Sequence, residues 1–149
     1  MPAAQPAPQE EFLVSDRFLV EIDGVPLHGF HSVVIADSEA DVVEYREGAD
    51  PPAQTHKLPG QIRYSSVRLV RGVSQAHHEL YDWWHSVVTG PVQRRSVVII
   101  ALDAGGQPAV RWHVLRAWPR LYRVSPFDAV SDTILCETLE LACEGVERA

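Results

Sequence analysis

The segment from Thr133 to Cys143 has apolar side chains on both of its faces. Leu135, Leu139 and Leu141 share one parity, and Ile134, Cys136 and Ala142 share the other. Successive side chains of a strand point to opposite sides, so a strand wetted on one side would not have this pattern. We expect this final strand to lie centrally in a sandwich, or to have its second face covered by another chain.

Most of the remaining chain has the alternation of apolar and polar residues that is typical of half-buried strands. We expect further strands over residues 18–23, 30–35, 42–46, 62–71, 96–102, 109–115 and 121–124. A change of phase at Ser65-Ser66 indicates a bulge, and Trp118-Pro119 is expected to break the run before it. The pattern predicts a mainly β fold of about seven or eight antiparallel strands.

One stretch has helical spacing instead. Ser74 is a good N-cap, and Gly90-Pro91 provides a stop signal, so we predict a helix over residues 75–88. The apolar positions at that spacing are Ala76, Leu80, Trp83, Trp84, Val87 and Val88. The helix is therefore amphipathic and is expected to flank the sheet. Trp83-Trp84 and Trp112 could form a ligand platform, but core packing is the commoner role of such aromatics.

Residues 47–60 are predicted to form a long loop, because they contain three prolines and two glycines. Loops of this length inside a compact domain are usually functional. The first nine residues are rich in proline and alanine and lack the features of a secretory signal. We therefore expect a disordered tail over residues 1–11, a single domain over residues 12–149, and synthesis in the bacterial cytoplasm. The longest apolar run, Val97 to Leu102, is too short to span a bilayer.

The net charge of −7 is unevenly distributed along the chain. Residues 1–60 carry 11 acids and 3 bases, residues 61–123 carry 3 acids and 9 bases, and residues 124–149 carry 6 acids and 1 base. The arginines of the middle segment are dispersed and the whole chain is acidic, which argues against nucleic-acid binding. The acidic and basic segments face each other within one chain, or an acidic face of one copy meets a basic face of the next. We favour the first interpretation.

The sequence contains few residues in patterns that are typical of a catalytic or metal site. The sequence has no phosphate-binding glycine loop, no Gly-x-Ser-x-Gly elbow and no His-Glu-x-x-His or Cys-x-x-Cys motif. On the predicted helix His78, Asp82 and His85 share one face and could ligate zinc, but a solvated polar stripe is the favoured interpretation because no fourth ligand is evident. We therefore expect no catalytic residues, no metal and no cofactor.

The two cysteines and two nearby glutamates do not form a site either. Cys136 and Cys143 lie seven residues apart on one expected strand, about 23 Å from end to end, so they cannot bridge each other within it. They are expected to be reduced thiols in packed or half-packed positions, and neither has a recognisable base motif beside it. Glu137 and Glu140 are expected on opposite faces of the strand and cannot act as one carboxylate pair.

Six segments in order resemble the inner tube proteins of contractile phage tails, the conserved phage tail region proteins, and their relatives in extracellular contractile injection systems. They are Phe18-Leu19-Val20-Glu21-Ile22-Asp23-Gly24, Val43-Glu44-Tyr45-Arg46-Glu47-Gly48, His56-Lys57-Leu58-Pro59-Gly60, Leu80-Tyr81-Asp82-Trp83-Trp84, Arg94-Arg95, and Glu137-Thr138-Leu139-Glu140-Leu141 followed by Glu144-Gly145. Together they extend from residue 12 to the end of the chain. Cys143 stands where a polar or aromatic residue is expected.

The resemblance implies a structural protein and not an enzyme. The chain would fold as an antiparallel β-sandwich or partial barrel with one flanking helix. Six copies would close into a ring, and rings would stack into a hollow tube that the sheath drives through a target envelope. The implied partners are further copies of the chain, the sheath protein, baseplate, hub and terminator proteins, and DNA or effector proteins as cargo in the lumen. The target membrane would be crossed only as part of the particle, a phage virion or an extracellular or cytoplasmic contractile particle.

The resemblance also implies where the subunits meet. The long loop would reach a neighbouring subunit or the next ring, and the helix would face the sheath. The hypothesised interface residues are Glu47, Asp50, His56, Lys57, Leu58, Pro59, Gly60, Arg94, Arg95, Glu137 and Glu140. A small β-barrel module that binds a ligand is the main alternative function, and a metal-dependent hydrolase built on the His78 and His85 face is a more distant one.

Overall fold

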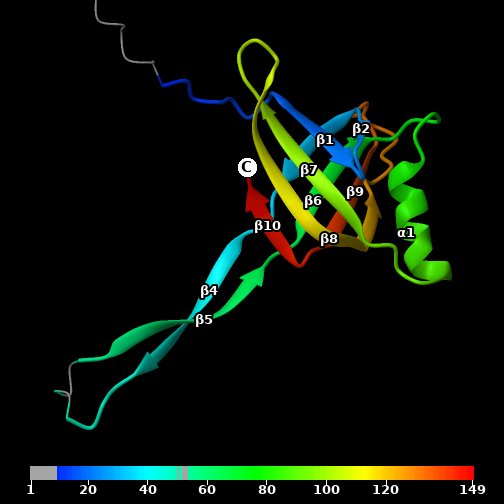
Figure 1. Cartoon of the computed structure of the whole chain (residues 1–149). Helices are drawn as coiled ribbons and strands as arrows, with labels where there is room; N and C mark the ends of the chain where they lie inside the picture. Colours follow the sequence, from blue (N-terminus) through cyan, green and yellow to red (C-terminus); the bar gives the residue numbers. More distant parts are fainter. Residues whose placement is uncertain (1–9, 50, 52–53) are drawn as a thin grey trace, which may run out of the picture.

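The computed structural model describes residues 10–49, 51 and 54–149. It shows a strongly curved antiparallel sheet, with one helix beside it and a two-stranded hairpin that projects away from it (Figure 1). The expected mainly β fold with one flanking helix is therefore confirmed, in the form of a partial barrel that does not close. Most of the expected disordered tail, residues 1–9, lies outside the described residues.

Eight strands form the curved sheet, in the order β2-β1-β7-β8-β9-β6-β3 with β10 also paired to β8. The strands are β1 (Phe18–Ile22), β2 (Val25–Leu27), β3 (Phe30–Val34), β6 (Val67–Gly72), β7 (Arg95–Leu102), β8 (Pro108–Val124), β9 (Cys136–Ala142) and β10 (Gly145–Arg148). The hairpin consists of β4 (Ser38–Tyr45) and β5 (His56–Tyr64), and the helix is α1 (Glu79–Thr89).

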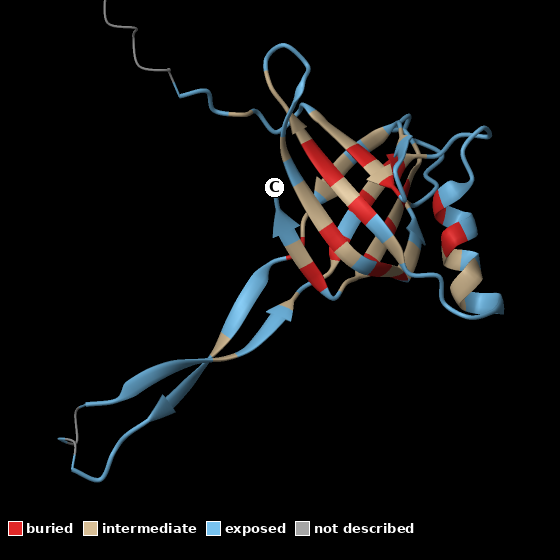
Figure 2. Ribbon diagram, viewed as in Figure 1, coloured by how far each residue is buried: buried red, intermediate tan, exposed pale blue. Residues whose placement is uncertain are grey.

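The core lies on the concave side of the sheet (Figure 2). Alternate side chains of neighbouring strands meet there, among them Val20, Leu69, Val97, Val114 and Leu139, which are all almost completely buried. Burying each such side chain stabilises the fold by about 1.5–3 kcal/mol before the entropy of ordering the chain is subtracted. This set of strands therefore holds the core, and of the described hairpin residues only Tyr64, at the end of β5, packs against it.

The final strand lies centrally in the sheet, which was one of the two expectations for it. It is shorter than expected. β9 pairs with β6 on one side and with β8 on the other. Its inner face carries Glu137, Leu139 and Leu141, all buried, whereas its outer face is half-buried. Ile134 precedes the strand and is 79% exposed. The short strand β10 was not expected.

The expected break at Trp118-Pro119 is wrong, because β8 continues through it. The first half of β8 pairs with β7 and the second half with β9, so this strand joins both halves of the sheet. Arg116 has a positive φ of 50°, and the register with β9 shifts between Pro119 and Leu121. Proline is tolerated in a sheet at such an irregularity, because no ladder hydrogen bond from its nitrogen is required there.

The helix begins later than predicted. Its N-cap is His78, which makes no side-chain capping bond, and its first residue is Glu79. The Ser74 hydroxyl instead accepts a hydrogen bond from the Ala76 amide at 3.3 Å, which stabilises a turn before the helix. Leu80 and Trp83 are the buried residues of the helix. No helix in the described part of the chain is long and apolar enough to cross a membrane.

Charges of the different segments pair within the chain, as the favoured interpretation predicted. Basic residues of the middle segment lie beside acidic residues of both ends, in the pairs Arg63–Asp41, Arg68–Glu140, Arg71–Glu137, Arg94–Glu144, Arg95–Asp23, Arg116–Glu144 and Arg120–Glu140. The two cysteines are free and half-buried, also as predicted. Burial raises the pKa of the Cys143 thiol.

Candidate assembly interface

The β4–β5 hairpin is joined to the barrel by a narrow neck. The Ser65 amide donates a hydrogen bond to the Asp37 carbonyl at 3.1 Å, and the Asp37 amide donates one to the Ser65 hydroxyl at 2.7 Å. Beyond this neck the two strands extend together away from the barrel (Figure 1). The bulge expected at Ser65-Ser66 is therefore the point where β5 ends and β6 begins. The chain leaves the hairpin there and enters the curved sheet.

Cross-strand contacts fix the register of the hairpin. Val43 stands opposite Leu58, and Tyr45 stands opposite His56 with their ring centroids 5.2 Å apart. Nearer the neck, the Arg63 Nε donates to both carboxylate oxygens of Asp41, at 3.1 and 2.9 Å. Both partners of that pair are substantially exposed, so the pair orients the strands more than it stabilises them.

Gly60 lies where the two strands of the hairpin come closest. The register shifts between Ala40 and Val42 on the opposite strand. A β-carbon at position 60 would lie 3.0 Å from the Val43 Cγ2 and 3.1 Å from the Asp41 carbonyl oxygen. Only glycine fits this approach without displacing the backbone. The bulge and the glycine together set the local bend of the hairpin.

Large apolar side chains of the hairpin are open to solvent (Figure 2). Val42, Val43, Tyr45, Leu58 and Ile62 are between 42% and 62% exposed, and they come from both strands. An isolated two-stranded hairpin is marginally stable in water, and contiguous exposed apolar surface marks a site of interaction. The hairpin, with apolar side chains exposed on both of its faces, is therefore a candidate surface for contact with another chain. The residues hypothesised from the sequence include Leu58 but not the other four, although the adjacent valines at positions 42 and 43 were a visible signal.

The structure brings six of the hypothesised interface residues together on this hairpin. Residues 56–60, from His56 to Gly60, lie on β5, and Glu47 follows the end of β4. The prediction of a loop over residues 47–60 is thus wrong for residues 56–60, because Pro59 and Gly60 are accommodated at a bulged edge strand. Asp50 lies outside the described residues.

Arg94 and Arg95 lie on the barrel instead, at the start of β7. Arg95 stacks over the Trp83 ring, with its guanidinium carbon 5.5 Å from the ring centroid, and donates to the Gln93 side chain at 2.8 Å. The Nε of Arg94 is 3.9 Å from a carboxylate oxygen of Glu144. Trp83 donates its own indole hydrogen bond to the Gln93 carbonyl at 2.8 Å. Arg95 therefore helps to fix α1 against the sheet, and Arg94 remains the more accessible of the two.

Glu140 and Glu137 point to opposite faces of β9, as predicted. Glu140 lies on the outer face, in ion pairs with Arg68 and Arg120. Glu137 is 4% exposed and faces the interior, where the Tyr122 hydroxyl donates to it at 2.9 Å. Because its carboxylate is enclosed within its own chain, Glu137 contributes to the fold and not to a surface. Its shared parity with Leu139 and Leu141 was the sequence signal for this position.

The partner of Glu137 is a buried arginine. Arg71 is 1% exposed, with its Nε 3.5 Å from a carboxylate oxygen of Glu137 and its guanidinium 5.6 Å from the centre of the Phe30 ring. Its Nη2 reaches Glu79 at the start of α1. Burial, and then the hydrogen bond to the Glu137 carboxylate, raise the pKa of Tyr122 to about 12. The ion pairs of Arg71 with Glu79 and Glu137 therefore join α1 to the sheet.

The polar stripe of α1 faces solvent. His78, Asp82 and His85 are exposed, and the His85 ring stacks on Tyr81 with centroids 5.7 Å apart. Among the described residues there is no cluster of three or more histidine, cysteine, aspartate or glutamate side chains that could hold a metal ion. These residues are therefore surface positions in the single chain.

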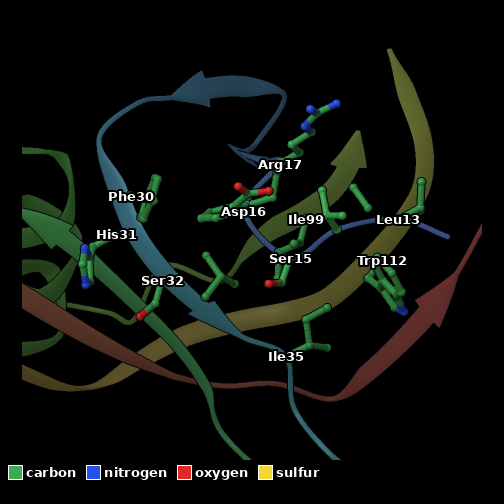
Figure 3. A pocket seen from close by; sticks show the side chains of 14 residues that line it. Leu13, Ser15, Asp16, Arg17, Phe30, His31, Ser32, Ile35, Ile99 and Trp112 are labelled. Atoms are coloured by element: carbon green, nitrogen blue, oxygen red, sulfur yellow. The ribbon is translucent and has the colours of Figure 1, made fainter. Parts of the chain in front are cut away.

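A groove of about 740 Å³ opens at the end of the barrel where β1 begins (Figure 3). Residues 13–18 cross one side of it, and residues 30–33 with Ile35 form the other side. Ile99, Ala101 and Trp112 also line it. Its lining is mostly apolar, with Asp16, Arg17 and His31 among the polar residues that line it. The groove is a second surface able to receive apolar groups.

A core held by the curved sheet and a projecting hairpin with exposed apolar side chains favour a protein that associates with other chains. Comparison with known proteins identifies the family. The chain belongs to the family described as T4-like virus tail tube protein gp19, whose model matches residues 14–147. It is a structural tail tube protein and not an enzyme. No curated protein matched the sequence.

Solved structures give the same result. The chain is similar to one in the PVC sheath/tube terminator of an extracellular contractile injection system in its extended state, with 27% identity, 99% of each chain covered and a TM-score of 0.82. It is also similar to a chain of the PVC sheath-tube complex in the extended state, with 28% identity, 92% and 90% coverage and a TM-score of 0.83. The anti-feeding prophage tube terminating cap has the same fold, with 24% identity, 97% and 95% coverage and a TM-score of 0.86.

Proposed function

We propose that this protein is the repeating subunit of the inner tube of a contractile phage-tail-like particle or injection system. Six copies close into a ring, and the rings stack into a hollow tube. Membership of the tail tube family and likeness to chains of sheath–tube and terminator assemblies support this role. The observation that carries it is the β4–β5 hairpin, whose strands pair with each other and with no third strand among the described residues.

The hairpin supplies the main contact between copies in this proposal. An unpaired sheet edge is a template for pairing with another chain, and a head-to-tail interface that closes by rotation satisfies the edges of every copy. The interface residues that we propose on it are Glu47, Asp50 and residues 56–60. Arg94, Arg95 and Glu140 are proposed as charged residues that contact a neighbouring copy from the barrel surface.

The proposed partners follow from the particle. The sheath surrounds the tube and contacts α1, and baseplate, hub and terminator proteins bind at its ends. The lumen conducts DNA or effector proteins, and the tube crosses a target membrane only as part of the particle. Synthesis in the bacterial cytoplasm precedes assembly. Contraction of the sheath moves the tube, so the subunit makes and breaks no covalent bond.

Electron microscopy of the purified protein in negative stain, with native mass spectrometry of the same sample, tests this function. We expect six-fold rings or hollow tubes. A strictly monomeric protein at high concentration, with or without baseplate components, contradicts the proposal and favours the alternative of a ligand-binding module in the groove. A variant with Val43→Asp and Leu58→Asp tests the hairpin.

The expected result of that variant is a folded monomer that does not assemble. Val43 and Leu58 are 48% and 49% exposed and stand opposite each other, so two aspartates leave the barrel core intact. They place like charges directly across the strands and at the proposed contact. The matched control is Val88→Ser on α1, where Val88 is 63% exposed, and this variant is expected to assemble normally. Normal tubes from the double aspartate variant would exclude the hairpin as the contact.

A further inference from the structure

The connection between β8 and β9, residues 125–135, has a fixed base. The Ser125 amide donates to the Cys136 carbonyl at 2.8 Å, and the Cys136 amide donates to the Ser125 hydroxyl at 2.9 Å. At its other end the Leu135 carbonyl accepts from the Val73 amide at 2.8 Å. These three bonds hold both ends of the segment to the rest of the fold, so it is presented in one position.

Inside the 125–135 segment, polar side chains are used for local turns. The Asp128 carboxylate accepts from the Val130 amide at 3.1 Å, and the Asp128 carbonyl accepts from the Ser131 amide at 3.2 Å. The Ser131 hydroxyl accepts from the Thr133 amide at 3.4 Å and lies 3.1 Å from the Thr133 hydroxyl. Aspartate and serine commonly fix turns in this way.

The apolar side chains of the same segment point into solvent. Phe127 is 85% exposed, Val130 94% and Ile134 79%, which makes them three of the four most exposed large apolar residues in the described part of the chain. Such a cluster on a segment held by hydrogen bonds is unusual for a free surface, because each side chain gains by burial. A fixed presentation also reduces the entropy lost on binding.

No residue of the 125–135 segment lines the groove. Strand pairing places Phe18 opposite Ala101, and Ile99 opposite Trp112, beside the groove. Val124, which leads into the 125–135 segment, pairs with Glu137 twelve residues further along β8 than Trp112. The chain therefore carries projecting apolar side chains on one surface and an apolar groove on another. Two different complementary surfaces on one chain are what a head-to-tail contact requires.

We propose that the 125–135 segment of one copy inserts Phe127 and Val130 into the groove of the next copy, in a head-to-tail contact. This inference rests on the proposed tube assembly and adds a second contact that does not involve the hairpin. A second copy is the occupant because the chain belongs to a family of tube subunits and carries both halves of the contact itself. The apolar lining of the groove, including Ile99 and Trp112, matches the aromatic ring and the valine.

Photo-crosslinking tests the contact directly. Phe127 is replaced by a benzoyl-phenylalanine, which its exposure allows, and the assembled protein is irradiated. We expect a crosslinked dimer whose joined peptides contain position 127 and residues 13–18 or 30–35. Crosslinks that map only to other surfaces, or no dimer from protein that has assembled, overturn the inference.

Two variants give an independent measurement. Phe127→Ser with Val130→Ser is expected to raise the protein concentration needed for assembly by about tenfold or more, because two apolar groups lose their burial. Ser15→Trp, which fills the groove from an exposed position, is expected to act in the same direction. Val88→Ser is the matched control for exposed apolar surface elsewhere, and circular dichroism checks that each variant is folded.

The outcomes separate this inference from the proposed function. If the wild-type protein forms no rings or tubes, the proposed function fails and this contact fails with it. If the wild-type protein assembles and both variants assemble at the same concentration as the control, the proposed function stands and this contact alone is wrong.

Discussion

The Nη2 of Arg71 lies 2.6 Å from the Glu79 Oε2, and so joins a side chain that is 1% exposed to one that is 43% exposed. Arg71 belongs to β6 and Glu79 begins α1, so the pair fixes the first turn of the helix to the sheet. The acidic residue also lies where the amides at a helix N-terminus favour negative charge. Within the barrel, the same arginine neighbours Glu137, and its Nη1 is buried without a hydrogen-bond partner in the described part of the chain.

Removal of this arginine should destabilise the fold strongly. Arg71→Met leaves Glu137 buried without its cation, and we expect the free energy of unfolding to fall by about 3–5 kcal/mol. The combined variant Arg71→Met with Glu137→Leu should recover a large part of the loss, because no buried charge is left unpaired. Urea unfolding followed by circular dichroism measures both. Arg63→Met, at the 62% exposed position on the hairpin, is the control and should change stability by about 1 kcal/mol or less. An equal loss in the single and double variants would contradict this account.

The stability that the Arg71–Glu79 pair contributes should decrease at acidic pH. The hydrogen bond from Arg71 lowers the pKa of Glu79 from its ordinary value of 4.5. A carboxylate with a lowered folded-state pKa contributes stability above 4.5 and loses it as the pH falls through the lower value. Glu79→Gln should therefore be less stable than the wild type at neutral pH, and the difference should shrink below pH 4.5. Urea midpoints across this range measure the difference, and a constant gap would show that the charge of Glu79 is not involved.

The ionisation of Tyr122 should be detectable at alkaline pH. Its folded-state pKa of about 12 exceeds the ordinary value of 10.0, so its neutral form contributes stability below pH 10.0 that is lost as the pH rises through about 12. Titration of phenolate absorbance should show a step near pH 12 that the Tyr122→Phe variant lacks. In Glu137→Gln the step should move to lower pH, because the hydrogen bond to a carboxylate is lost. A step unchanged in both variants would assign it to another group.

Gly60→Ala should separate assembly from folding. The new methyl group meets the backbone oxygen of Asp41 at 3.1 Å, so the hairpin must distort locally while the barrel core is unaffected. We expect an unchanged barrel by near-ultraviolet circular dichroism and at least a tenfold higher concentration for tube formation, by the relation of about 1.4 kcal/mol per tenfold. Gly48→Ala is the matched control, because a β-carbon there meets nothing within 4 Å. Equal assembly by the two variants would remove the role assigned to the bend.

Much of the fold could be predicted from alternation alone, because a strand buried on one side has a simple period. β1, β3 and β7 were placed to within one or two residues at each end. The errors lie where tertiary contacts override local signals. Pro119 was taken as a break, yet a register shift accommodates it within β8. Ser74 was taken as the helix cap, yet the contact between Arg71 and Glu79 lies at the observed start of the helix.

The surface proposed for assembly was harder to predict from the sequence. In a single chain, a residue whose contact partner lies in another chain looks like any other surface residue. Residues 56–60 were proposed as interface residues through the family resemblance, and the structure places them on a hairpin strand that no local pattern indicated. Glu137 illustrates the opposite case, because its charge indicated a surface position while its parity with Leu139 placed it inside. The exposure of Phe127 depends on the turn bonds of residues 128–133, which sequence periodicity does not encode.

The hairpin also has a consequence for the free subunit before it finds a neighbour. No third strand among the described residues pairs with β4 or β5, and open strand edges of this kind lead in many proteins to disordered aggregates. Here the charged side chains of β4 are acidic, Glu39 and Glu44 among them, and those of β5 are basic, Lys57 and Arg63, so two hairpins that meet β4 to β4 or β5 to β5 bring like charges together. In the proposed assembly this repulsion disfavours contacts between like edges and leaves the β4 edge of one free subunit open to the β5 edge of another.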